Sequence, residues 1–172
     1  MKIIIWASLV IPFCLGACQM QGGISLKQKR NFIDLVKELP AGSGGEIYTA
    51  DAITQANPYL PVLLALDDVD VGMEDIYPFI ALSRGLCDQA QNRDYVIRNF
   101  SEIRHPVLKL VWGVMLFDAG SASPGIVQFL KNSLKSKKQS QILSEALGDD
   151  FSDLQKRLGA ERPRSAKRLI GY

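Results

Sequence analysis

The chain has 172 residues, a length that fits one ordinary domain with its own hydrophobic core. Its 20 lysines and arginines nearly balance its 18 aspartates and glutamates, so the formal net charge is only +2. One histidine and three cysteines leave little material for a structural zinc site, which needs four nitrogen or sulfur ligands.

The first residues have the three parts of a secretory signal peptide. Lys2 provides a positive charge, residues 3–15 are apolar, and small residues precede Cys18. The apolar run is shorter than the ~20 residues that a membrane-spanning helix needs. The sequence LGAC at positions 15–18 resembles the bacterial lipoprotein box. This resemblance implies that Cys18 receives a diacylglycerol, that the leader is cut before it, and that its new amine is acylated.

The residue after this cysteine is Gln19, where an aspartate would resemble an inner-membrane retention signal. In a Gram-negative cell we therefore expect an outer-membrane anchor, with the protein facing the periplasm. Several acyl chains suit this role, since one chain alone gives only marginal membrane binding. A secretory leader also argues against nucleic acid as a partner.

The cysteines and the composition divide the chain into four segments. Cys14 leaves with the leader and Cys18 carries lipid, so Cys87 is the one thiol left and no intramolecular disulfide can form. Cys87 lies in an apolar helical stretch and is predicted to be buried and inert. No cofactor and no metal site is expected. The segments are a signal peptide over 1–17, the lipidated cysteine and a short tether over 18–24, a single helical domain over 25–160, and a basic tail over 161–172.

Apolar residues recur at helical spacing along the whole domain, and no alternating strand pattern appears. Ser25 and Ser123 are predicted N-caps, Trp112 a core residue, and Asn57-Pro58 a break between a short helix and a central apolar one. The fold class is therefore predicted to be all-α. The helices are expected within residues 26–39, 48–68, 74–90, 92–103, 105–120, 123–136, 138–150 and 150–161.

Two segments about 48 residues apart share a pattern. Residues 57–68 and 105–120 each begin a proline-opened helix that is apolar on nearly every side, with an aspartate near its end. Repeats of ~40–47 residues with helices of 12–15 residues are typical of HEAT and armadillo proteins. The sequence is thus compatible with a compact irregular helical bundle or with a short HEAT- or armadillo-like stack of helical hairpins.

An acidic segment separates the predicted central helix from the next one. No lysine or arginine occurs between Glu38 and Arg84, whereas the tail over 161–172 is basic. Such asymmetry can steer a charged partner. The spacing of these acidic residues does not match an EF-hand loop. Three roles remain as alternatives: a weak calcium site, contact with the chain's own basic tail, or a docking patch for a basic partner. The residues predicted to bind a partner are Asp67, Asp68, Asp70, Glu74 and Asp75.

The sequence contains partial matches to catalytic motifs, but none of these motifs is complete. Ser43 and Ser123 lack the first glycine of a nucleophile elbow and follow no predicted strand. His105 precedes Pro106 at a helix start, where it either helps the turn or faces water. The acidic pairs are adjacent in sequence, so they point to different sides of a helix and do not converge as paired carboxylates must. We therefore expect a protein that is not an enzyme.

The expected localisation, the size and the helical content favour a protein-binding module, by analogy with other small helical lipoproteins. The leading hypothesis is an immunity lipoprotein that neutralises a toxin from a type VI or contact-dependent secretion system. One alternative is a pilotin-like or assembly lipoprotein of an envelope secretion machine. Another is an envelope hydrolase, which would need a nucleophile with its base, paired carboxylates or a set of metal ligands. A cleft with converging carboxylates would favour it.

Overall fold

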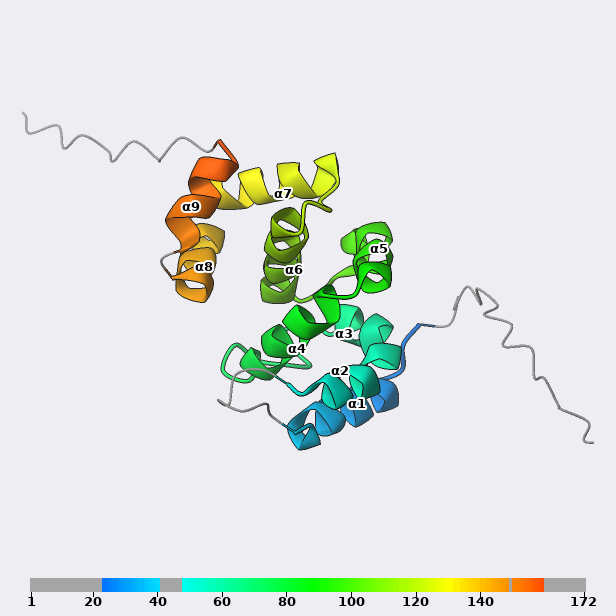
Figure 1. The fold of residues 1–172 in the computed structure, drawn as a ribbon. Helices are drawn as coiled ribbons and strands as arrows, with labels where there is room; N and C mark the ends of the chain where they lie inside the picture. The colour runs from blue at the N-terminus through cyan, green and yellow to red at the C-terminus, as the bar shows by residue number, and fades with distance from the viewer. Residues whose placement is uncertain (1–22, 41–47, 149, 160–172) are drawn as a thin grey trace, which may run out of the picture.

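The computed structural model describes residues 23–40, 48–148 and 150–159, and every regular element in these ranges is a helix, which confirms the all-α prediction. The predicted leader, Cys18 and the basic tail lie outside the described residues, as does Ser43. The elements (Figure 1) are α1 Leu26–Glu38, α2 Ala50–Ala56, the 3-10 helix η1 Asn57–Tyr59, α3 Leu60–Ala65, α4 Tyr77–Cys87, α5 Ala90–Arg98, the 3-10 helix η2 Phe100–Glu102, α6 Pro106–Asp118, α7 Pro124–Lys135, α8 Lys137–Leu147 and α9 Asp150–Arg157.

Local sequence signals explain where several helices begin. The Ser25 hydroxyl accepts the backbone N–H of Gln28, whose side chain in turn accepts the N–H of Ser25, so α1 opens with a capping box. Ser123 accepts from the N–H of Ile126 and caps α7. Both predicted N-caps are therefore confirmed. Prolines also stand in the first turns of α4, α6 and α7, where a missing N–H costs nothing.

The predicted break at Asn57-Pro58 is confirmed, but the helix after it is shorter than expected. A 3-10 turn follows α2, and α3 has only 6 residues, whereas α6 has 13. The two segments that share a sequence pattern therefore form unlike elements. The expectation of helices of 12–15 residues is wrong for most of the chain, and the described part is an irregular bundle rather than a stack of equal hairpins (Figure 1).

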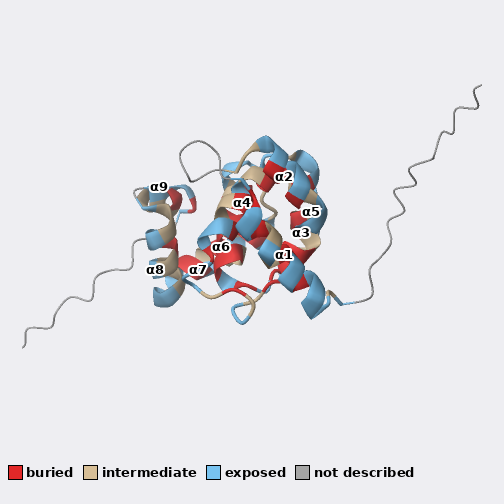
Figure 2. Ribbon diagram, turned by 90° about the horizontal axis from the view of Figure 1, so that it is seen from below, coloured by how far each residue is buried: buried red, intermediate tan, exposed pale blue. Residues whose placement is uncertain are grey.

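Helix α6 lies between two hydrophobic clusters, which is why it is apolar on nearly every side. Trp112 and Leu116 pack with α1 to α5, and both are fully buried as a core position requires. Leu110 and Val114 pack instead with α7, α8 and α9. Figure 2 shows buried residues where the helices meet and exposed ones on the outer sides of α1, α2 and α5. In the described ranges, no helix is both long and apolar enough to cross a bilayer.

Candidate functional site

The predicted acidic segment forms an ordered loop between α3 and α4. The Asp67 carboxylate accepts the backbone N–H groups of Val69 and Asp70, each at 3.1 Å. The Asp70 carboxylate accepts the N–H of Asp67 at 3.0 Å. These reciprocal bonds hold the turn, because short acidic side chains readily satisfy nearby backbone donors. Asp67 and Asp70 thus have a role within the fold.

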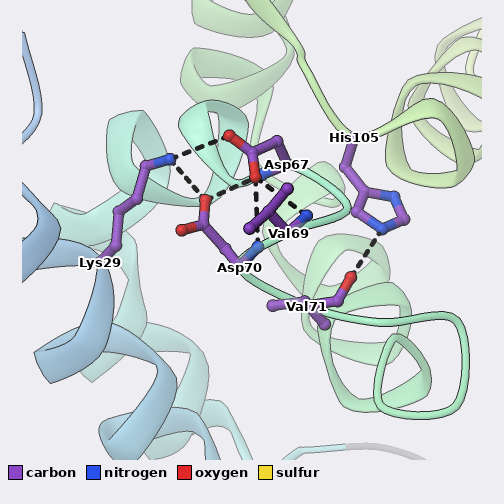
Figure 3. A network of polar contacts seen from close by, with 6 residues as sticks. All are labelled: Lys29, Asp67, Val69, Asp70, Val71 and His105. Carbon is purple, nitrogen blue, oxygen red and sulfur yellow. Dashed lines mark hydrogen bonds and ion pairs between the residues drawn. The ribbon is translucent and has the colours of Figure 1, made fainter.

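Lys29 on α1 fixes this turn from outside the loop (Figure 3). Its ammonium group lies 3.3 Å from the Asp67 carboxylate and also binds that of Asp70. Only 7% of Lys29 is exposed. The lysine stands 38 and 41 residues before its partners, so no local sequence pattern could reveal the pairing. Its ammonium is the cation that these two carboxylates share.

The electrostatics of Asp67 follow from these contacts. Burial raises its pKa, but the N–H of Asp70, the Lys29 ammonium and the N–H of Val69 together outweigh that effect. The net result is a pKa below the ordinary value for an aspartate. The carboxylate therefore stays ionised at neutral pH, as the ion pair needs.

His105 holds the far end of the loop (Figure 3). Its Nδ1 accepts the backbone N–H of Val107 at 3.3 Å and caps α6, so Nε2 carries the proton and donates it to the carbonyl of Val71 at 3.1 Å. The side chain is completely buried, which confirms the helix-start role and excludes the alternative that it faces water. Burial lowers the pKa of His105, although the Val71 carbonyl and the charges of Asp68 and Asp67 oppose this shift.

The rest of the loop faces solvent and mixes acidic with apolar side chains. Asp68, Glu74 and Asp75 are exposed, which makes them the accessible part of the predicted acidic set. Val69 is 92% exposed and Met73 57%. No local pattern predicts that these two apolar residues are exposed, because exposure of a valine or methionine depends on the packing around it. We call the exposed residues Asp68, Val69, Met73, Glu74 and Asp75 the acidic loop surface.

A groove runs beside this surface, between α4, α6 and α8. Its volume is about 790 Å³. Met73 and Tyr77 line it where the loop enters α4, so the groove and the acidic loop surface are continuous. Tyr77 is 60% exposed. The groove was not predicted, since it arises from helices that are distant in sequence; we refer to it as the α4–α8 groove.

The candidate reactive groups of the described chain offer little reactivity. Cys87 lines it and is buried as predicted, and burial raises its pKa to about 11, so its thiol is protonated at neutral pH. The Ser123 hydroxyl caps α7 and follows no strand. Both ring nitrogens of His105 are already engaged. In the part of the chain that the structure describes, no three or more His, Cys, Asp or Glu residues are grouped to hold a metal ion.

Comparison of the chain with protein-family models, with curated proteins and with solved structures found no match.

Proposed function

We propose that this chain is a lipid-anchored envelope protein that binds another protein and carries out no reaction itself. The observation that carries the proposal is the acidic loop surface. Its backbone is fixed by Lys29 and His105, while Asp68, Glu74, Asp75 and two apolar side chains stay exposed. A preformed surface of charged and apolar groups binds a partner with little ordering cost.

The proposed localisation rests on the sequence alone. The lipoprotein box at positions 15–18 supports acylation of Cys18, and Gln19 favours the outer membrane with the protein in the periplasm. The tether over 18–24 is short, since an extended chain reaches only about 3.5 Å per residue. The helical domain would therefore lie close to the membrane and meet proteins that arrive there.

Within this class we favour an immunity protein that blocks a secreted toxin. A toxin with a basic cleft would be attracted by the acidic loop surface, and a steered encounter is fast. An assembly lipoprotein of the pilotin kind would share the localisation and the fold. The immunity protein and the assembly lipoprotein would differ in the protein that each binds.

The test is photocrosslinking of the lipidated protein in its own envelope, with a photoreactive residue placed at Asp68 and products identified by mass spectrometry. One secreted toxin in near-equal amounts supports immunity, whereas a component of an envelope secretion machine supports the assembly role. Absence of any specific protein product would contradict the proposal.

A matched pair of triple variants tests whether charge at the loop matters. Asp68→Lys, Glu74→Lys and Asp75→Lys together should weaken partner binding in a salt-dependent manner. The same three changes at the exposed acids Asp34, Asp94 and Glu102 alter the net charge equally but lie outside the loop. Equal losses in the two variants would mean that only overall charge counts.

A further inference from the structure

We infer that the α4–α8 groove binds an amphipathic helix of the partner protein, one with an apolar stripe and flanking lysines or arginines. This inference rests on the proposed function and deepens it by naming the kind of segment bound. A helix laid in an apolar groove is a common recognition mode, with anchors at positions i, i+3, i+4 and i+7.

The walls of the groove are suited to such a stripe. α4 contributes Ile80, α6 contributes Val111 and Met115, and α8 contributes Ile142 and Leu147. Methionine is flexible and polarisable, and it adapts to side chains of different shape at binding surfaces. The groove therefore offers apolar side chains on three helices, next to the charged residues that also line it.

Exposed apolar side chains gather at the mouth of this groove. In the described residues the large apolar side chains that stay exposed are Leu26, Tyr59, Val69, Met73 and Tyr77. The last three belong to the acidic loop surface or the start of α4, and Met73 and Tyr77 line the groove itself. Exposed apolar residues that cluster beside a groove mark an interaction site more often than scattered ones do.

The charges around the groove select a basic occupant. Four carboxylates and two guanidinium groups line it. One carboxylate, that of Asp118, is paired with Arg157 at 2.8 Å. The guanidinium of Arg93 donates to the carbonyls of Cys87 and Asp88, which orient it but leave its positive charge in place. The remaining carboxylates are those of Asp88, Glu145 and Asp150, and they stand against the guanidinium groups of Arg84 and Arg93.

Glu74 and Asp75 are exposed and follow Met73, which lines the groove, so they add negative charge close to it. A helix with basic flanks would find complementary charge there. The phosphate of a lipid headgroup would instead be repelled. Charge thus favours a basic protein segment over a phospholipid.

The test measures binding of a synthetic helix to the full lipidated protein held in phosphatidylcholine nanodiscs. The probe is a fluorescent peptide of about 18 residues with leucine at the i, i+3, i+4 and i+7 positions and lysine elsewhere. One control peptide replaces every lysine with glutamate, and another keeps the composition but scrambles the order. Empty nanodiscs give the background from lipid.

Two pairs of matched variants locate the binding. Tyr77→Ala removes an exposed apolar side chain in the groove, and Leu26→Ala removes one outside it, at 68% exposure. Glu145→Lys reverses a charge that lines the groove, and Asp94→Lys reverses an exposed charge on α5. We expect the groove variants to weaken binding of the lysine peptide roughly tenfold and the other two to leave it unchanged.

Equal binding of the lysine and glutamate peptides, or equal binding of the scrambled peptide, would overturn the inference. Equal effects of the groove and control variants would do the same. A dimer of the protein that dissociates in Tyr77→Ala would assign the groove to a second copy of the chain and overturn it as well. The experiments distinguish a failure of the groove inference from a failure of the proposed function. A specific envelope partner crosslinked at Asp68, with no peptide binding, leaves protein binding in place and removes only the groove.

Discussion

The ammonium group of Lys29 on α1 binds the carboxylate of Asp70, 41 residues later in the chain, and both side chains are largely enclosed. Asp67 joins the same group at 3.3 Å. The pairing ties the loop between α3 and α4 to the first helix. An acidic cluster that the sequence presents as a docking patch is therefore divided by the fold into an internal part and an exposed part.

Removal of the Lys29 charge should destabilise the fold. Lys29→Met keeps an apolar stem but leaves the nearly buried carboxylate of Asp70 and the partly exposed one of Asp67 without their counter-charge. Breaking a pair of this kind lowers the free energy of unfolding by roughly 3 kcal/mol. Chemical denaturation followed by the fluorescence of Trp112 measures the change.

Arg30→Met is the matched control, because Arg30 is adjacent on α1 but exposed. A double variant, Lys29→Met with Asp70→Leu, should lose less stability than the sum of the single changes, since the two residues interact directly. If Lys29→Met costs no more than Arg30→Met, the ion pair does not hold the loop.

Stability should depend on pH through His105, the one histidine of the chain. Burial lowers its pKa in the folded state, so the unfolded state, with a pKa of about 6.5, binds more protons below neutrality. Protonation would also remove the Nδ1 acceptor that caps α6. The free energy of unfolding should therefore be constant above about pH 7.5 and fall as the pH is lowered from there to about 5.5.

His105→Asn is the variant that isolates this effect. Asparagine is a good N-cap but does not titrate. We expect the variant to be less stable at pH 7.5 yet to show no slope between about pH 5.5 and 7.5, measured by thermal melting at each pH. A slope equal to that of the unaltered protein would assign the titration to other groups.

The parts of this fold that the sequence predicts are those set by neighbouring residues. Ser25 and Ser123 are N-caps because their hydroxyls meet N–H groups three residues on, and Pro106 opens a helix because its ring fits the first turn. The apolar neighbours of Trp112 and Cys87 predict core positions for both. Both are buried.

The parts that the sequence does not predict depend on segments that meet only in the folded chain. Lys29 looks like one more basic residue on an amphipathic helix until α1 packs beside the loop. The α4–α8 groove needs three helices to be placed first. The position of His105 before Pro106 is compatible with a solvent-facing side chain, and only the folded chain brings the Val71 carbonyl, 34 residues away, to its Nε2.

Close packing of α2 on α4 requires a glycine at position 85. A methyl group there would lie 2.3 Å from Cδ1 and 2.8 Å from Cγ1 of Ile53. Ile53 is buried and has little room to move. Gly85→Ala should therefore lower the free energy of unfolding by about 1–3 kcal/mol, although alanine is the better helix former. Urea denaturation measures the change.

Gly125→Ala provides the comparison, since a methyl group on that first-turn residue of α7 would meet only the Ser123 hydroxyl, at 3.9 Å. It should be neutral or slightly stabilising. Ile53→Ala removes both clashing atoms, so it should make the cost of Gly85→Ala smaller. An unchanged cost in that background would show that the clash is not the cause.

The proposed localisation at the outer membrane depends on the predicted lipidation of Cys18. Cys18→Ala removes the thiol that would form the thioether with diacylglycerol, so fatty-acid labelling should disappear and the unprocessed precursor should accumulate. Labelled palmitate and gel mobility report both effects. Cys14→Ala and Cys87→Ala are the controls, because one cysteine lies within the leader and the other is buried. Labelling that survives Cys18→Ala, or that is lost in Cys87→Ala, would place the lipid elsewhere and remove the argument for an outer-membrane anchor.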